Sequence, residues 1–401
     1  MPCPASGQIS IADLVAEFGG TAPHAMSEYY RNAGLVPGNN TSVPTSGQFS
    51  LTNCYSAVNE VQHTHSDGDT HADYSSIFGS NWASTVPKRV IVPSGVTVGG
   101  TSTHAMLLPT GMGGTIVFDI TGNVYGYGGA AGTVGGNAIH CIQTTGVTIN
   151  VNSGANVKGG GGGGGAGGAG GAGGNGGAGG TGGQGRYMVT GSTLTVYDYY
   201  NSRMATLLTA CNNSPPSNYA NQVTGGHQVG QGYTHDQYRG YCQSWSYTSG
   251  GAGGAGGTSG GAGGAGGAGG VGQGYNQSAA SGASGAAGGS ASGTGAAGSS
   301  GGTSAGAGGT GGTAGAGGAG GTGGTGGALG ATGSTGATGT QGVTGGTGNS
   351  GANGNYANGA AGSAGAAGAA ASSGTAGAAA GYYIYNRASI TLNNSGTVAG
   401  Q

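Results

Sequence analysis

Hydrophobic and polar positions alternate in only a few short stretches of this chain, and each such stretch predicts a β-strand. The segments KRVIV at residues 88–92 and GTIVFDI at residues 114–120 are the clearest strand candidates. Residues 148–159 and 390–400 also alternate, turn at Asn-Ser-Gly, and end with a valine followed two residues later by glycine. Residues 122–126 are a weaker third copy. We interpret this strand-and-turn repeat as a cap for the helical bundle that the glycine-rich tracts predict, because the terminal units of a stacked architecture must be capped.

Residues 1–57 have ordinary complexity and contain an internal echo. The sequence SGQISI at 6–11 returns as SGQFSL at 46–51, which predicts a pair of short strands. Between the two copies, residues 13–18 predict one or two helical turns stopped by a glycine pair, and residues 25–30 predict a second short helix. We interpret this region as a small docking module.

Long stretches of the chain carry glycine at every third position. Residues 164–185 follow the rule Gly-Gly-X, and from residue 306 to residue 354 every third residue is glycine without exception. A period of three matches the left-handed polyproline II-type helix, which has three residues per turn, rather than an α-helix or a strand. Such helices contain no internal hydrogen bonds, so their backbones must bond sideways to neighbours. The arrays therefore predict a bundle of polyglycine II helices.

The glycine period slips at Thr258-Ser259, around Gly288-Gly289 and near Tyr356. We interpret these slips as turns between parallel and antiparallel helices. A collagen-like trimer is an alternative, but residues 250–401 contain no proline, on which collagen depends. A disordered Gly/Ser linker is a second alternative, although a coil does not require a strict phase.

Composition narrows the classes of function. The 401 residues include 107 glycines and only 4% charged residues, with a formal net charge of −2, so the chain lacks the basic surface of a nucleic-acid-binding protein. No apolar run reaches the length of a membrane span and no signal-peptide pattern is present, which predicts folding in the cytoplasm without membrane insertion. Five cysteines without a CxxC pair are expected to be reduced. No nucleophile elbow or P-loop lysine occurs, so we expect no enzyme.

The N-terminal region also carries a family resemblance. Residues 9–57 include the segments EFGG, SEYYR and a closing PTSG. In this respect the region resembles a short module of tail- and neck-associated structural proteins of double-stranded DNA phages. The resemblance implies that residues 1–57 attach the chain to other phage tail proteins, and that the chain is oligomeric within the virion tail after synthesis in the host cytoplasm.

The glycine tracts carry a second resemblance. Gly-Gly-X and Gly-X-X tracts that follow an attachment module and are interrupted by aromatic segments resemble the glycine-rich adhesins at the tips of some large tailed-phage fibres. That family has a sandwich of polyglycine II helices, and the loops that join its helices bind a receptor on the bacterial surface. The long region 58–157 and the insert 186–249 depart from the family pattern, so the resemblance supports the fold more than the position of the binding loops.

The expected fold is an irregular or all-β N-terminal part followed by a polyglycine II helical bundle or sandwich with aromatic loops and little α-helix. The expected division of the chain is an attachment module (1–57), a mostly β region (58–158), a glycine-rich polyglycine II segment (159–185), an aromatic-rich insert (186–249), a polyglycine II bundle (250–381) and a C-terminal strand cap (382–401).

Aromatic side chains gather in the insert. Tyrosine and tryptophan supply rigid amphipathic contact area and dominate recognition surfaces. A small aromatic core or an oligomer contact is the alternative explanation. The residues expected to contact a receptor, which is a bacterial surface protein or glycan, are Tyr197, Tyr199, Tyr200, Tyr219, Tyr233, Tyr238, Tyr241, Trp245 and Tyr247.

A histidine cluster is the one ligand-like group in the sequence. His63 and His65 form an HxH pair that places both imidazoles on one face of a strand, and His71 follows nearby. With Asp67, Asp69 and Asp73 nearby, the segment offers ligands for a divalent ion, although it lacks the spacing of an EF-hand and a bidentate glutamate. A polar linker is the alternative. We expect no other cofactor.

The predicted function is therefore a phage tail-tip or tail-fibre-associated adhesin that recognises the bacterial host surface. The first alternative is a purely structural virion protein, such as a tail-tip, collar or decoration protein. The second is an ice-binding protein, because polyglycine II bundles with a flat Ala/Thr face also bind ice.

Overall fold

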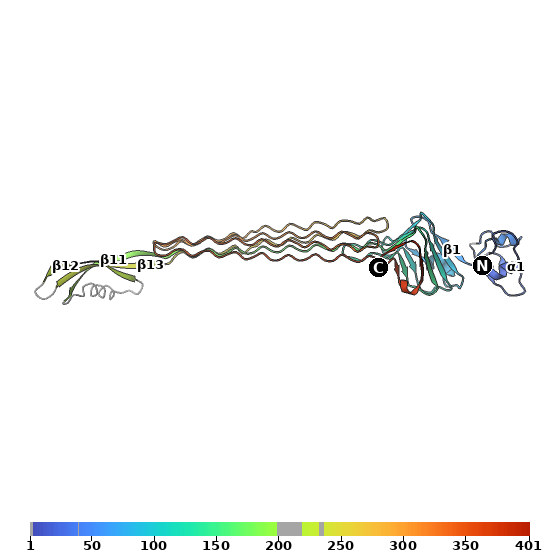
Figure 1. Ribbon diagram of the computed structural model, residues 1–401, viewed down its shortest axis with the longest axis horizontal. Helices are drawn as coiled ribbons and strands as arrows, with labels where there is room; N and C mark the ends of the chain where they lie inside the picture. Colours follow the sequence, from blue (N-terminus) through green and yellow to red (C-terminus); the bar gives the residue numbers. More distant parts are fainter. Residues whose placement is uncertain (1–2, 39, 199–218, 232–235) are drawn as a thin grey trace.

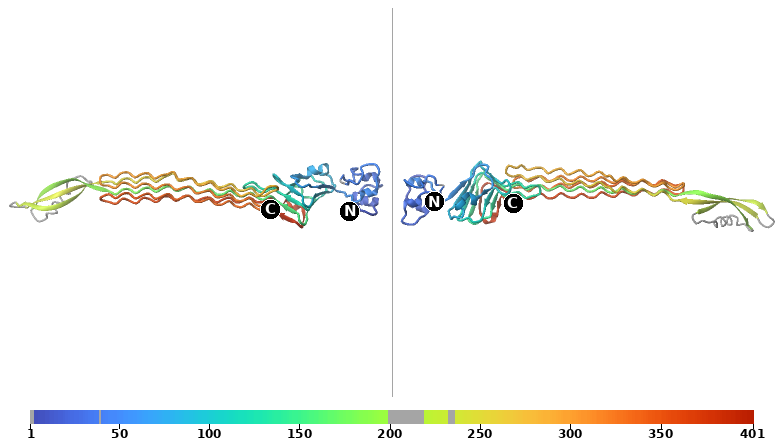
Figure 2. Two further views of the ribbon diagram at one scale, coloured as in Figure 1. Left: turned by 90° about the horizontal axis from the view of Figure 1, so that it is seen from above. Right: turned by 180° about the vertical axis from the view of Figure 1, so that it is seen from behind.

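The protein is elongated, and its parts follow one another along the long axis. The computed structural model describes residues 3–38, 40–198, 219–231 and 236–401. Figures 1 and 2 show a small N-terminal module at one end, then a β-helix, a long glycine-rich rod, and a β-sheet at the opposite end, which we call the tip sheet. The described residues contain little α-helix, as the sequence predicted, in α1 and α2.

The N-terminal module has short helices around its own small core. The helices are α1 (Ile11–Phe18), η1 (Met26–Tyr29) and η2 (Leu51–Cys54). The core comprises Cys3, Leu14, Phe18, Tyr29, Val36, Val43, Cys54 and Ala57. Cys3 and Cys54 are free thiols, as expected, and burial raises the pKa of each to about 11.

The echo in this module predicted paired strands, and that prediction is wrong. Each copy instead begins a helix: the Ser10 backbone N–H donates to the Asp13 carboxylate at 2.7 Å before α1, and the Ser50 N–H donates to the Asn53 side-chain oxygen at 2.9 Å before η2. The repeated pattern is therefore a pair of capping boxes, which satisfy backbone groups at a helix start.

A parallel β-helix follows the module. Each complete circuit of the chain, which we call a rung, adds one strand to each of three sheets, and neighbouring strands pair in parallel. In the described part of the chain, the first rung has no strand in the second sheet, and the last has none in the third. The first sheet has β1 (Val61–Thr64), β3 (Lys88–Val92), β6 (Ile116–Ile120), β9 (Val147–Val151) and β15 (Thr391–Asn394); the second has β4 (Thr97–Gly99), β7 (Asn123–Tyr125), β10 (Asn156–Lys158) and β16 (Thr397–Ala399); the third has β2 (Ala72–Asp73), β5 (Met106–Leu108), β8 (Ile139–Cys141) and β14 (Ile384–Tyr385). The short elements α2 (Tyr74–Phe78) and η3 (Gly79–Asn81) follow β2, and η4 (Arg387–Ser389) follows β14.

Side chains of equivalent positions stack inside the β-helix. Val90 pairs with Phe118, and Phe118 with Ile149, in register along the first sheet. All three are fully buried, and burying such a side chain contributes about 1.5–3 kcal/mol. On the outer face of the same sheet, Arg89 bonds to Asp119, and the Asn150 amide donates to Asp119 at 2.7 Å.

The strand-and-turn repeat is the corner between the first and second sheets. Its three recognised copies are β6–β7, β9–β10 and β15–β16, and an unrecognised fourth is β3–β4. The interpretation as a cap for the glycine bundle is wrong, because the repeats are successive rungs whose valines lie in one shared core.

The glycine-rich rod is an insertion into this β-helix. The chain leaves the second sheet after β10 and returns at β14, which pairs with β8 of the preceding rung. Within the described residues the rod consists of segment 1 (159–184), segment 2 (250–274), segment 3 (278–301), segment 4 (305–328), segment 5 (331–354) and segment 6 (357–381), which run back and forth along its length.

Backbone hydrogen bonds join these segments at intervals of three residues. Between segments 1 and 5, for example, Gly168 N–H donates to Ala337 O and Gly171 N–H donates to Thr340 O, at 2.8 and 2.9 Å. Segment 1 bonds to segments 2, 4, 5 and 6, and segment 4 bonds to segments 1, 2, 3 and 5. All of these bonds lie within one chain.

The segments with the most and the fewest neighbours differ in glycine content. Segments 1 and 4, with four neighbours each, repeat Gly-Gly-X, whereas segment 6, with two, repeats mainly Gly-X-X. Segments 2 and 5 have three neighbours each, and the first repeats Gly-Gly-X while the second repeats mainly Gly-X-X. A Cβ added at Gly168 would lie 1.9 Å from Ser372 O. Glycine is therefore required wherever two backbones touch.

Two of the three slips in the glycine period are not turns. Gly176 and Gly173 of segment 1 bond to Gly257 and Gly261, so segment 2 gains one residue at Thr258-Ser259 and continues in the same direction. Segment 3 gains a matching residue after Gly289. The prediction of turns is wrong at both places, whereas the slip near Tyr356 does coincide with the turn between segments 5 and 6.

Candidate functional site

The tip sheet occupies the end of the molecule farthest from the N-terminal module (Figure 1). Its strands are β11 (Gly185–Asp198), β12 (Tyr219–Gln231) and β13 (Asp236–Thr248), in the order β11-β13-β12 with antiparallel pairing. The described part of the insert is thus a sheet rather than a set of loops.

Strand register shows which end of the tip sheet is outermost. Gly185 pairs with Thr248 next to the rod, and both Asp198 and Gln231 are Cα partners of Asp236. The ends of β11 and β12 and the start of β13 therefore meet at the distal edge of the protein.

The sequence-predicted receptor residues fall on all three strands. Tyr197 belongs to β11 and Tyr219 to β12, while Tyr238, Tyr241 and Trp245 belong to β13. The remaining positions Tyr199, Tyr200 and Tyr233 lie outside the described residues.

Tyr247 lies at the joint between the tip sheet and the rod. Its ring packs edge-on against Tyr356, with ring centroids 4.7 Å apart, and the Arg186 guanidinium lies 5.5 Å from the Tyr356 centroid. The side chain of Asn355 accepts from Arg186 N–H at 2.7 Å and donates to Arg186 O at 2.8 Å. These contacts fix the base of the tip sheet to the turn between segments 5 and 6. Sequence reasoning missed Asn355, because nothing in its local pattern indicates a partner so distant along the chain.

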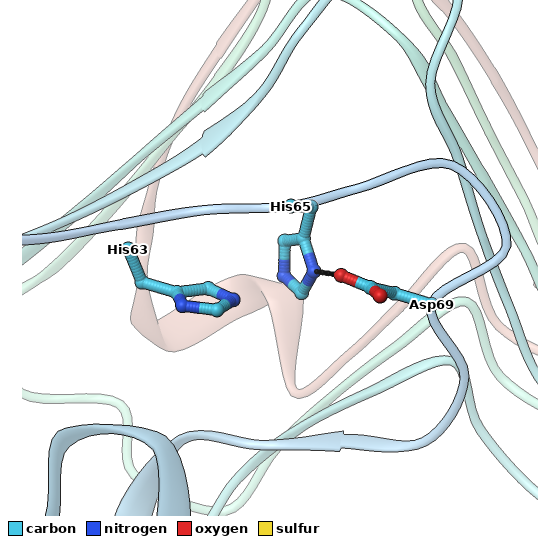
Figure 3. Close-up of side chains that lie close together, drawn as sticks. All are labelled: His63, His65 and Asp69. Carbon is cyan, nitrogen blue, oxygen red and sulfur yellow. Dashed lines mark hydrogen bonds and ion pairs between the residues drawn. The ribbon is translucent and has the colours of Figure 1, made fainter.

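The predicted metal residues separate into two places. His63 and His65 lie together with Asp69, and the ligand atoms of these three residues are within 4.8 Å of one another (Figure 3). His71 lies elsewhere, where its Nε2 is 2.6 Å from the Thr101 hydroxyl oxygen. Asp69 takes the third place because the turn after His65 brings it back toward that ring.

Hydrogen bonds hold the His65 ring from both sides. Its Nδ1 is 2.8 Å from Asp69 Oδ2, and its Nε2 is 2.8 Å from the Tyr74 hydroxyl oxygen. Burial lowers the pKa of His65 against the opposing effect of Asp69, and burial also lowers the pKa of His63. Both shifts favour the neutral form of the imidazoles. Partial burial acts to raise the pKa of Asp69, but the hydrogen bonds from His65 and from Ser66 N–H, together with the electrostatic effect of the two imidazoles, outweigh it and the pKa is lowered.

A row of neighbouring rings, in edge-on or tilted contact along the third sheet, was not recognised in the sequence. The ring centroids of His71 and His104 are 6.3 Å apart, those of His104 and His140 are 5.5 Å apart, and those of His140 and Tyr385 are 4.7 Å apart. Burial lowers the pKa of His104 and of His140. The spacing of the three histidines along the chain was the available signal, because it matches the length of a rung.

No helix within the described ranges is long and apolar enough to cross a membrane. A search of curated proteins finds none that matches the chain. A solved structure, the gp37-gp38 adhesin tip complex of the bacteriophage S16 long tail fibre, is similar at 14% sequence identity over 99% of both chains, with a TM-score of 0.34.

A family model supplies the assignment. Residues 60–245 match the model of the phage tail fibre adhesin Gp38. The matched range begins just before β1, runs through the β-helix strands β1–β10 and segment 1 of the rod, and ends within β13 of the tip sheet. This match identifies the chain as a phage tail fibre adhesin of the virion.

Proposed function

We propose that the adhesin recognises the bacterial surface through the aromatic-rich insert, residues 186–249, whose described part is the tip sheet. The observation that supports this assignment is position: the tip sheet, which is the described part of the aromatic-rich insert, lies at the end of the protein opposite the N-terminal module (Figure 2). The receptor residues would be those of the insert, Tyr197, Tyr199, Tyr200, Tyr219, Tyr233, Tyr238, Tyr241 and Trp245. Tyr247 is the exception, because it packs on the rod and would orient the tip sheet.

Attachment to the virion is the proposed role of residues 1–57. The module has a core of its own, separate from that of the β-helix, and it lies at the opposite end of the molecule from the tip sheet. A surface at this end can bind other tail proteins without obstructing the tip. The partner in the fibre would be a further tail fibre protein, and the adhesin would be one part of an oligomeric assembly.

The rod is proposed to be a polyglycine II sandwich that acts as a rigid spacer. The hydrogen-bond interval of three residues supports the polyglycine II geometry. The bonding pattern suits two layers, with segments 3, 4 and 5 in one and segments 2, 1 and 6 in the other, because segments 1 and 4 alone bond to four others. Rigidity along this axis would hold the tip sheet away from the fibre.

The adhesin is proposed to act by binding and not by catalysis, in keeping with the adhesin family that it matches. The divalent ion expected at His63 and His65 would stabilise the first rung rather than contact the receptor, and it is a separate proposal.

Competition for host adsorption tests the tip assignment. Purified full-length chain should block adsorption of its phage to the host. The Tyr238→Ala/Tyr241→Ala variant should need about tenfold more protein for the same block, the ratio that corresponds to a loss of 1.4 kcal/mol in binding. The matched control is Tyr382→Ala/Tyr385→Ala, which removes two half-exposed tyrosines near the β-helix end of the rod and should compete like the unchanged chain.

Two outcomes would contradict the assignment. If saturating unchanged chain leaves adsorption untouched, the protein is a structural tail component rather than the receptor-binding one. If the control pair loses competition and the tip pair retains it, the receptor surface lies near the β-helix.

A further inference from the structure

We propose that His63, His65 and Asp69 form a binding site for one divalent transition-metal ion of the zinc type, which links the first strand of the β-helix to the turn that follows it. The three residues are two imidazoles and one carboxylate from a single short stretch of chain. No function of the tip sheet depends on this site.

Backbone geometry brings the three side chains together. His63 lies in β1, and His65 follows directly after it, so the two rings are on the same side of an extended chain. The chain then turns through Gly68, whose φ of +89° suits glycine, and a hydrogen bond from Ser66 N–H to Asp69 Oδ2 at 3.0 Å closes the turn. Figure 3 shows the His63 ring facing His65 while Asp69 approaches His65 from the other side.

The present arrangement leaves one buried nitrogen unsatisfied. His63 Nε2 is buried and has no hydrogen-bond partner. A buried polar atom without a partner destabilises the fold, because it has lost its hydrogen bonds to water. A metal ion among the three residues would supply the missing partner, since neutral imidazole nitrogen is a metal ligand.

The neighbouring contacts of His65 suit a metal ligand. Its two ring nitrogens bond to Asp69 and to the fully buried Tyr74 hydroxyl. A bound ion would replace one of these hydrogen bonds and leave the other to hold the ring in place. Ligating histidines generally use their second nitrogen in this way.

The donor set selects the class of ion. Two imidazoles and one carboxylate favour Zn²⁺ and related transition metals, whereas Ca²⁺ and Mg²⁺ prefer oxygen ligands alone. Zinc–ligand bonds of about 2.0–2.1 Å require the three ligand atoms to lie closer to one another than they do in this arrangement, where they lie within 4.8 Å of one another. Rotation of the His63 and Asp69 side chains can achieve this contraction, because neither is fully buried. A water molecule would complete four coordination.

Titration calorimetry of the tag-free, full-length chain with Zn²⁺ tests the proposal, with Co²⁺ absorption reporting the geometry. Unchanged chain should bind one Zn²⁺ and show the intense visible bands of tetrahedral Co²⁺. His63→Phe, which keeps a ring of similar volume, and Asp69→Asn should each weaken binding at least tenfold. The matched control is His71→Ala, whose side chain bonds to Thr101 outside the cluster, and it should bind like the unchanged chain.

Thermal unfolding separates loss of the site from loss of the fold. Saturating Zn²⁺ should raise the Tm of the unchanged chain and of His71→Ala, but not that of His63→Phe. The proposal is overturned if the unchanged chain binds no Zn²⁺, or if His63→Phe binds it as tightly as the unchanged chain does. Equal loss of binding in His71→Ala would also overturn it, because the ion would then lie elsewhere.

Discussion

The β-helix and the rod are both built by stacking one short backbone unit, yet they use side chains in opposite ways. In the β-helix, Phe118 and Ile149 are in register and fully buried, so the side chains fill the space between strands. In the rod, a Cβ at Gly318 would lie 2.0 Å from Thr340 O, so backbones fill that space. The β-helix therefore requires a large side chain at alternate positions of its strands, whereas the rod requires a residue without a side chain at every third position.

The two regions also differ in charge. Residues 159–185 and 250–381 contain no Asp, Glu, Lys, Arg or His. The outer face of the β-helix carries a hydrogen-bonded row in which Glu60, Arg89 and Asp119 meet. The rod satisfies its polar backbone through neighbouring backbones instead, which leaves its stability almost independent of salt and pH.

The largest effect is expected from removing a buried side chain of the β-helix. Phe118→Ala removes a ring at the centre of the β-helix and should lower the free energy of unfolding by about 3–5 kcal/mol, because a cavity adds to the lost burial. Denaturant unfolding followed by circular dichroism measures the change. Amide exchange within the rod should remain slow, since its bonds do not involve this core.

The matched control for this prediction is Val117→Ala. Val117 is the next residue of the same strand and is only partly buried, so its truncation should cost much less. Similar losses for the two variants would mean that the interior of the β-helix is not the source of its stability.

A smaller effect is expected from adding a methyl group to the rod. Gly311→Ala places a Cβ 2.1 Å from Ala255 O, and we expect a cost of about 1–3 kcal/mol, as for other overpacked sites. Amide hydrogen exchange of segments 2 and 4 should report the separation of the two backbones as faster exchange near the substitution.

Ala314→Gly is the control, because this position is one step of three residues along the same face of segment 4. Ala314 is 7% exposed and lies opposite the places where segments 2 and 3 each gain a residue. Its methyl group is therefore already accommodated, and the substitution should change exchange little. Faster exchange for Ala314→Gly than for Gly311→Ala would refute the requirement for bare backbone.

This pair of positions also explains where sequence reasoning failed. The slip at Thr258-Ser259 was interpreted as a turn because a break in the glycine period is the pattern expected where one helix ends and the next begins. The structure shows that the extra residue makes room for Ala314 on another segment, which no local pattern can reveal. Conversely, the turn at Gly330 keeps the glycine phase unbroken, so the sequence contained no sign of it.

Other features were predictable to different degrees. The strands at residues 88–92 and 114–120 follow from alternation, and β3 and β6 confirm them. The β-helix was missed because its strands are short and because the rod separates β10 from β14 in the sequence. His63 and His65 were found from their spacing, and the turn after β1 selects Asp69 from the three aspartates near them. Local patterns thus identify single strands, glycine-rich segments and histidine pairs. Which of these elements lie side by side depends on chain reversals that the local pattern does not encode.

The smallest expected effect concerns hydroxyl groups that supplement the backbone of the rod. The Ser372 hydroxyl accepts from Ala169 N–H at 2.8 Å, and Ser363 and Thr375 make equivalent bonds to segment 1. Ser372→Ala should cost about 0.5–1.5 kcal/mol, the usual net value of one hydrogen bond. Exchange of the Ala169 amide should accelerate while that of Gly168, which bonds to Ala337, stays slow. The neighbouring Ser373→Ala is the control and should alter neither amide. If the Ala169 amide is equally protected from exchange in both variants, the backbone alone sets the stability of the rod. Its serines and threonines then serve only to keep its surface hydrated.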